Sequence, residues 1–403
     1  MIQNSVRTNW LVVALCFLPV FMDGFDTSAL ALAIPALAGD WGLVPAAFTL
    51  PLVATSVGVV VGYIASGWAA RGIGRRRLLI GSSVLFSAGT LVTAMVLPTH
   101  SVEAVTLVRL VTGLGFGGAY PSGVAFATDF SSKRQRQVVP LLVTLGFAAG
   151  ATVAGVASQQ LITMFGTEGL FWSAGVVSGA TALLLVAFLP AERAPVVGEG
   201  RRTERVAQLF ERAVRLDTLL LWTFAFLAFL VSTALTSWVP VLLGQLGFGA
   251  AEAPLGLAFV YLGAIAGGVA VIPLAARLGI GRTLVVLPLL GALCLVAMAG
   301  GSAGGVALLI LLAGAGAGIS GSQSGQLGMA VSLYPPEHRT TGIGWASALG
   351  KAGSIAGPSV AGIMLGTGSS AGTIFAVAAA GLAVAIGCAV LLWVRTRGRT
   401  AAR

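Results

Sequence analysis

Residues 69–76 read AARGIGRR and residues 275–282 read AARLGIGR, the same residues with one inserted. A second pair of stretches is also alike, since residues 113–123 read GLGFGGAYPSG and residues 314–325 read GAGAGISGSQSG. Each pair takes the same place in its half of the chain, after the second and within the fourth of six apolar runs. A duplicated six-helix unit is typical of two-bundle secondary transporters, whose site lies at the membrane midplane between the halves.

The composition excludes a water-soluble domain. Of the 403 residues, 57% are hydrophobic and 9% are charged, and the mean hydropathy is +0.97. A soluble domain is nearer half apolar and a quarter charged. Since about 20 apolar residues cross a bilayer, the apolar runs predict twelve spanning helices, at approximately residues 10–34, 46–69, 77–97, 104–128, 137–161, 169–189, 217–244, 253–275, 283–299, 304–333, 340–366 and 371–394.

The expected fold is therefore an all-α integral membrane protein, with twelve transmembrane helices in two pseudo-symmetric six-helix bundles. One long connection rich in arginine and glutamate divides the spans six and six. The expected domains are an N-terminal bundle over residues 1–190, a cytoplasmic linker over residues 191–216 and a C-terminal bundle over residues 217–403.

The charges predict the orientation in the membrane. With these spans, every cluster of Lys and Arg falls on one side, and the loops on the other side contain acidic residues and a histidine but no Lys or Arg. By the positive-inside rule, both termini of this multi-pass protein lie in the cytoplasm and the membrane is the inner, cytoplasmic one. The net charge of +10 thus reflects topology, and nucleic-acid binding is not expected.

Nothing in the sequence indicates an enzyme, so no catalytic residue, cofactor or metal is expected. The two histidines, His100 and His338, fall on opposite sides of the membrane, and the three cysteines are far apart in the chain. The GLGFGG string lies inside a span with no preceding strand, so it is not a nucleotide fingerprint.

Four ionisable residues lie inside the predicted spans, where charge is costly and usually functional: Asp23, Asp26, Arg109 and Lys351. Each lies well inside its span, at a depth of about 20 Å for Asp23 and about 18 Å for Lys351. Asp23 and Asp26 share one helical face, and two close carboxylates in a low dielectric cannot both ionise cheaply. One of them is therefore a candidate proton carrier, with Arg109 as its partner. The alternative is a purely structural ion pair between Arg109 and either aspartate.

Lys351 has no acidic residue within four positions, so its counter-charge comes either from a carboxylate substrate or from the first span. We expect it to hold the substrate anion. Nearby spans supply amides that can orient a polar ligand and rings that can stack on one, although membrane aromatics more often pack or anchor the interface. These further candidates for substrate binding are Gln323, Gln326, Tyr120, Phe25 and Trp345.

A gate is expected at the cytoplasmic side of the first half. Arg71, Arg75 and Arg76 follow the second span, and Asp129 ends the fourth. An ion pair between these two groups would lock one transport state.

Over essentially its whole length the chain resembles the major facilitator superfamily. Residues 67–77, GWAARGIGRRR, look like its loop signature, and residues 109–121, RLVTGLGFGGAYP, look like its fourth-span motif with a buried arginine. Residues 22–37, MDGFDTSALALAIPAL, look like the DGxD motif of the aromatic acid:proton symporters. Residues 334–358 are similar to that family's tenth-loop and eleventh-span motif.

The resemblance implies proton-driven import of benzoate, a hydroxybenzoate or a related aromatic acid, by alternating access. It places Asp23, Asp26 and Arg109 at important positions of the family. The expected partners are thus the aromatic carboxylate, protons and the lipid bilayer, and a monomer is expected.

Three residues depart from the family pattern. Ala70 stands where the loop motif has an acidic residue, Asp129 where glutamate is expected, and Lys351 where arginine is expected. A lysine is a point charge rather than a bidentate fork, so the geometry at the carboxylate and the substrate itself can differ. The alternatives are a proton-coupled exporter, a carrier of another organic acid on the same fold and, from a different class, a receptor that binds without transporting.

Overall fold

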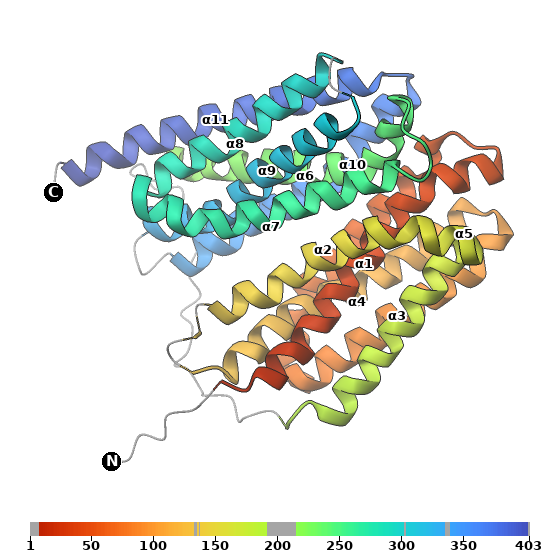
Figure 1. The fold of residues 1–403 in the computed structure, drawn as a ribbon. Helices are drawn as coiled ribbons and strands as arrows, with labels where there is room; N and C mark the ends of the chain where they lie inside the picture. Colours follow the sequence, from red (N-terminus) through yellow and green to blue (C-terminus); the bar gives the residue numbers. More distant parts are fainter. Residues whose placement is uncertain are drawn as a thin grey trace. The chain divides into compact units, whose positions relative to one another are not determined.

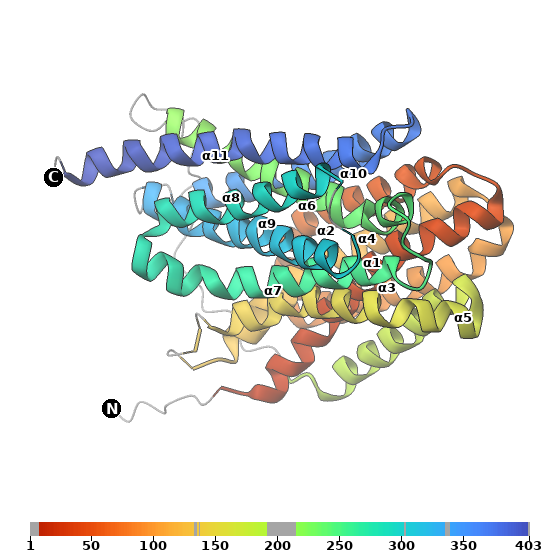
Figure 2. The same ribbon diagram turned by 45° about the horizontal axis from the view of Figure 1, so that its top comes forward.

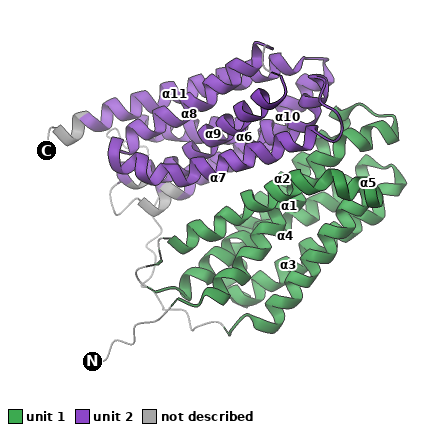
Figure 3. Ribbon diagram, in the orientation of Figure 1, with its two compact units in different colours: residues 1–195 green, residues 196–403 purple. Residues whose placement is uncertain are grey.

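The computed structural model describes residues 8–132, 135–136, 138–191, 215–301, 304–334 and 339–401. The chain divides into two compact units, residues 1–195 and residues 196–403, coloured separately in Figure 3. Most of the linker predicted at residues 191–216 lies outside the described residues, as do Lys133, Arg134 and His338.

Each unit is a bundle of long helices (Figure 1), and the described residues contain no strand. The helices of unit 1 are α1 Trp10–Trp41, α2 Thr49–Ile73, α3 Arg75–Val96, α4 Val102–Asp129 and α5 Val138–Phe188, with short 3₁₀ turns at Pro45–Phe48 and Leu97–Thr99. Those of unit 2 are α6 Arg215–Gln245, α7 Ala253–Leu278, α8 Ile280–Ala299, α9 Val306–Leu333, α10 Arg339–Gly366 and α11 Ala371–Ala401. The all-α class predicted from the sequence is confirmed.

The helix α5 contains two of the twelve predicted spans. It is 51 residues long, and Gly166 interrupts it with φ 74° and ψ 177°, a conformation open to glycine but strained for other residues. The described helices therefore comprise twelve helical segments. Ten of the helices, α5 counted once, are long and apolar enough to cross a membrane, and α10 is not among the ten.

The two units repeat the same packing. In each, the first helix packs on the fifth and the second on the fourth, as α1 on α5, α2 on α4, α6 on α10 and α7 on α9. Glycine makes these contacts possible: a Cβ on Gly24 of α1 would lie 1.9 Å from the Phe147 carbonyl oxygen, and one on Gly263 of α7 would lie 1.9 Å from that of Ala313. Close backbone contact through small residues is how helices associate where lipid provides no hydrophobic drive.

The turns between second and third helices show how the repeated motifs correspond. Gly74 ends α2 with φ 85° and ψ 154°, and Gly279 ends α7 with φ 82° and ψ 154°. The two glycines are therefore equivalent, which pairs Arg71 with Ala276 rather than with Arg277. The alignment by sequence, with one inserted residue, therefore differs from the structure by one position at Arg71 and by two at Gly74, which it pairs with Gly281.

In unit 2, α11 lies alongside both α6 and α8, as Figures 1 and 2 show. A buried apolar cluster fills the half of this unit near the start of α6 and the end of α11; its larger members include Leu221, Phe224, Met329, Tyr334 and Leu392.

Candidate functional site

The central feature of unit 1 is a fully buried ion pair. Arg109 Nη1 of α4 donates to Asp26 Oδ2 of α1 at 2.6 Å, and both side chains are 0% exposed. The structure thus pairs Arg109 with Asp26, a choice that the sequence left open between two aspartates. A charge pair removed this completely from water is stable only when other hydrogen bonds complete it.

Two threonines supply those hydrogen bonds. Thr90 Oγ1 of α3 donates to Asp26 Oδ1 at 2.8 Å, and Thr55 Oγ1 of α2 accepts from Arg109 Nε at 3.2 Å. Arg109 Nη2 has no hydrogen-bond partner among the described residues. Four helices therefore converge on one buried polar cluster, which consists of Asp26, Thr55, Thr90 and Arg109.

Three members of this cluster lie away from the middle of their helices, whereas Asp26 lies at the middle of α1. Thr55, Thr90 and Arg109 are six or seven residues from the ends of α2, α3 and α4 that meet the loops 42–48 and 97–101. At 1.5 Å per residue that is a depth of about 10 Å. These three residues are thus close to the end of unit 1 that carries these two loops.

Asp23 lies one turn of α1 from Asp26 and is 6% exposed. The hydroxyl of Thr27 donates to Asp23 Oδ1 at 3.2 Å. Tyr120 of α4 is half-buried and lies close enough to Asp23 to interact with its charge, whereas Phe25 is buried. The structure therefore places Tyr120 close to Asp23.

In unit 2, the two predicted glutamines connect α9 to its neighbours. Gln323 Nε2 donates to the Ala228 carbonyl of α6 at 3.2 Å, and Gln326 Nε2 donates to the Ala346 carbonyl of α10 at 3.3 Å. Gln326 is buried, and its Oε1 accepts no hydrogen bond from the described residues. A buried acceptor of this kind is costly unless a donor reaches it.

Lys351 is half-buried near the middle of α10, five residues beyond the carbonyl that Gln326 contacts. Trp345 is 41% exposed and stacks on Trp222 of α6, with ring centroids 5.7 Å apart and planes 25° apart. Six residues separate Trp345 from Lys351, which puts the two side chains on different faces of the helix. Gln326 therefore contacts α10 at the residue next to Trp345, between one and two helical turns before Lys351.

The predicted gate residues separate into three different environments. Arg75 forms an ion pair with Asp129, and these side chains are 43% and 45% exposed. Arg76 instead donates to the Leu189 and Val186 carbonyls at the end of α5, at 3.0 and 3.2 Å. Arg71 is exposed and has no ion pair among the residues described. The side chain of Asp129 is shorter than the glutamate expected there, but it still forms an ion pair with an arginine.

Sequence reasoning missed two groups of polar residues. Thr90 was not distinguished from Thr93, because each threonine occurs in a similar apolar context. Asp217, at the first turn of α6, is 0% exposed and accepts a hydrogen bond from Arg395 Nε of α11 at 2.5 Å. Asp217 is the first residue of the predicted span 217–244, where the sequence alone does not distinguish a buried carboxylate from a solvated one.

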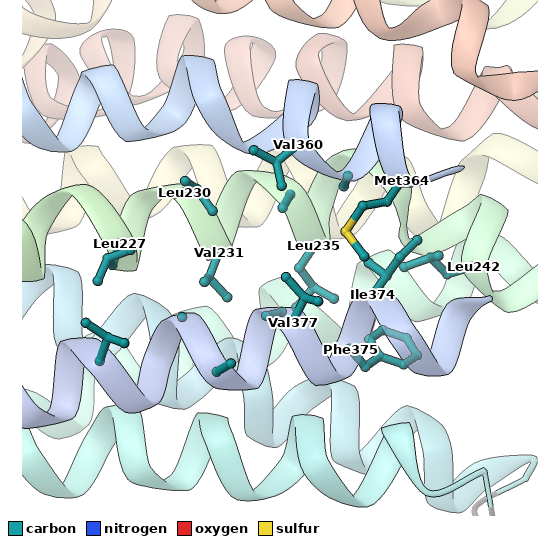
Figure 4. A pocket seen from close by; sticks show the side chains of 16 residues that line it. Leu227, Leu230, Val231, Leu235, Leu242, Val360, Met364, Ile374, Phe375 and Val377 are labelled. Atoms are coloured by element: carbon teal, nitrogen blue, oxygen red, sulfur yellow. The ribbon is translucent and has the colours of Figure 1, made fainter. Parts of the chain in front are cut away.

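A separate groove of about 360 Å³ lies among α6, α10 and α11. Figure 4 shows the labelled Leu235, Met364 and Phe375 among the side chains that line it. All its lining residues are apolar or glycine, so a carboxylate would find no polar side chain there. This groove is distinct from the candidate site.

Comparison with known proteins agrees with this architecture. The sequence profile of the Major Facilitator Superfamily matches residues 16–323. The chain is 30% identical over 396 residues to the 4-hydroxybenzoate transporter PcaK of Pseudomonas aeruginosa, which covers 89% of this chain and 87% of the relative. It is 32% identical over 403 residues to the 3-(3-hydroxy-phenyl)propionate transporter of Escherichia coli, and the match covers 98% of this chain and 97% of that relative.

Among solved structures, the crystal structure of a D-xylose-proton symporter is similar with a TM-score of 0.74 at 14% identity, over 93% of this chain and 97% of that one. At this identity the likeness shows the fold alone. The family and fold class predicted from the sequence are confirmed. The chain belongs to the Major Facilitator Superfamily and, within it, to the family of these aromatic acid transporters; it is a membrane transporter and not an enzyme.

Proposed function

We propose that this protein imports an aromatic carboxylate together with a proton across the cytoplasmic membrane by alternating access. The observation that carries the proposal is the fully buried ion pair of Asp26 and Arg109, in a chain whose relatives are named as transporters of hydroxylated aromatic acids. In this proposal both termini are cytoplasmic, as the arginine-rich loops favour, and the protein is a monomer.

The proton is carried by the aspartate pair of α1. With Asp23 and Asp26 ionised and Arg109 positive, the three side chains carry a net charge of −1, and one proton makes them neutral. Two carboxylates this close and this buried cannot both ionise cheaply, so the uptake of one proton is the proposed event in the cycle. Asp23 is the more exposed of the two, so it is the entry point for the proton.

The substrate anion is held by unit 2. Lys351 supplies the positive charge, and Gln326 and Gln323 supply amide groups from the adjacent α9. In unit 1, Tyr120, which lies close to Asp23, is the candidate for a ring contact with the aromatic acid. Phe25 and Trp345 have packing partners or are buried, so we rank them behind Tyr120 as ring contacts. Arg75 and Asp129 form the gate. Arg76, which binds carbonyls at the end of α5, and the exposed Arg71 are secondary candidates for it.

The experiment is uptake into proteoliposomes with and without an inward proton gradient. The probes are radiolabelled 4-hydroxybenzoate, 3-(3-hydroxyphenyl)propionate and an aliphatic acid such as succinate. We expect gradient-stimulated accumulation of an aromatic acid, its loss in Asp23→Asn and Asp26→Asn, and its retention in Asp40→Asn, a carboxylate that is exposed at the far end of the same helix.

Lys351→Ala should abolish accumulation, while Lys351→Arg should keep part of it because the charge is preserved. Accumulation of succinate alone would reject the aromatic substrate. Accumulation that is equal with and without the gradient would reject proton coupling, and gradient-driven efflux alone would favour an exporter.

A further inference from the structure

Thr90 has more hydrogen-bond acceptors within reach than it can serve. Its Oγ1 lies 2.8 Å from Asp26 Oδ1 and 2.9 Å from the Phe86 carbonyl oxygen of its own helix. A hydroxyl has a single hydrogen to donate, so only one of these two bonds can be a donation by Thr90 at any moment. Thr90 and Asp26 are both 0% exposed, so water is not there to satisfy the other.

We propose that Thr90 is a positioning residue whose hydrogen bond reverses when Asp26 gains or loses its proton. With Asp26 ionised, the Thr90 hydroxyl donates to Oδ1. With Asp26 protonated on Oδ1, the carboxyl O–H donates to Thr90 Oγ1, and the threonine hydrogen turns to the Phe86 carbonyl. The hydroxyl keeps its own hydrogen throughout, and the only bond formed or broken is the O–H bond of Asp26.

This reversal removes a cost that a buried carboxyl otherwise meets. An ionised carboxylate is an acceptor only, whereas a protonated one also has a hydrogen to donate. A buried donor or acceptor without a partner destabilises the protein by the full free energy of removing that group from water. Because Thr90 can accept or donate, Asp26 has a partner in both protonation states without any movement of α1 or α3.

Thr55 cannot play the same part. Its hydroxyl donates to the Pro51 carbonyl at 2.8 Å and accepts from Arg109 Nε, so both of its roles are already taken. Its hydrogen bonds stay the same whichever form Asp26 takes. The switchable hydroxyl of the cluster is therefore on α3 and not on α2.

The partners of Asp26 from other helices are the charged Arg109 and the neutral hydroxyl of Thr90. Among the helices packed against α1, α4 brings the charge of Arg109 and, further along, Tyr120, and α2 brings Tyr63. Residues 78–99 of α3 and residues 138–165 of α5 contain no ionisable side chain. On α1 itself, Asp23 lies one turn away. The proposal rests on the proposed function in one respect, namely that Asp26 changes its protonation state during transport.

The test compares Thr90→Val with Thr93→Val. Thr93 is a matched control because it lies on the same helix, is 0% exposed and donates to the Gly89 carbonyl of its own helix at 2.8 Å. The readout is the pH profile of 4-hydroxybenzoate uptake into proteoliposomes. A bond to the ionised carboxylate is roughly twice as strong as one to the neutral form. Its loss should therefore move the midpoint of the Thr90→Val profile to higher pH, by about half to one unit.

Thr90→Ser keeps the hydroxyl, so it should restore the wild-type midpoint, and Thr93→Val should leave it unchanged. A midpoint in Thr90→Val equal to that in Thr93→Val would overturn the proposal. If Thr90→Val does not fold, Thr90→Ala removes the same hydroxyl and leaves room rather than excess volume.

A second readout does not depend on the substrate. Infrared difference spectra of the lipid-reconstituted protein between high and low pH contain a protonated-carboxyl band, which Asp26→Asn identifies by its absence. We expect Thr90→Val to shift this band and Thr93→Val to leave it in place. Absence of any aromatic uptake by the wild type would reject the proposed function, whereas an unshifted Asp26 band in Thr90→Val would reject the role of Thr90.

Discussion

Replacement of Asp26 by asparagine tests the ion pair independently of transport. The change keeps the shape of the side chain and removes the charge that faces Arg109. The guanidinium then keeps its hydrogen bond to Thr55 and the amide oxygen of the new side chain, while its Nη2 group already has no partner among the described residues. A positive charge that is 0% exposed is left without a counter-ion.

The expected cost is large because both partners are fully buried. Breaking a buried ion pair by removing one member destabilises a protein by about 3–5 kcal/mol. For a unit of about this size, 1 kcal/mol corresponds to roughly 2–4 °C in melting temperature. Asp26→Asn should therefore lower the melting temperature by about 6–20 °C.

Thermal unfolding in detergent micelles, followed by the fluorescence of the eight tryptophans, measures this change. Asp40→Asn is the control, since that carboxylate is exposed on the same helix. In the double variant Asp26→Asn with Arg109→Gln the buried charge is gone, so it should be more stable than Asp26→Asn alone. A loss below about 1 kcal/mol in the single variant, or a double variant that is no more stable, would refute the reasoning.

Further predictions follow from the helix contacts and the peripheral ion pairs. Gly263→Ala should abolish folded yield in a size-exclusion assay, because its Cβ would lie 1.9 Å from a backbone oxygen, whereas Gly67→Ala, with nothing within 4 Å, should express normally. Asp217→Asn weakens the bond to Arg395 and should cost about 1–3 kcal/mol in the same melting assay; an unchanged melting temperature would contradict this. Asp129→Asn breaks a half-exposed pair, so it should cost less than about 1 kcal/mol and change the initial uptake rate at most about fivefold; a larger loss of stability would mean that the pair is structural.

The sequence was sufficient for the architecture because hydrophobic length and repetition determine it. Twelve apolar runs, a duplicated unit and the positions of Asp26 and Arg109 inside their spans follow directly from composition and spacing. The break at Gly166 was also placed correctly between two predicted spans, although the helix continues on both sides of it.

What the sequence could not supply is the direction in which each side chain points. Depth along a helix can be counted, but rotation about its axis depends on the packing of neighbouring helices. For this reason the partner of Arg109 stayed open between Asp23 and Asp26, and Thr90 looked the same as Thr93. The stacking of Trp345 on a ring from another helix was hidden for the same reason.

The close backbone contacts also change what the amino-acid composition means. In a water-soluble chain, 56 glycines would suggest loops and mobility. Here many of them are the points where one helix touches another, as at Gly24, Gly58 and Gly267, where an added methyl group would fall 1.9, 2.2 and 2.0 Å from a backbone oxygen. At such positions even alanine would force the two helix backbones to shift, so the smallest side chains hold some of the tightest packing in this protein.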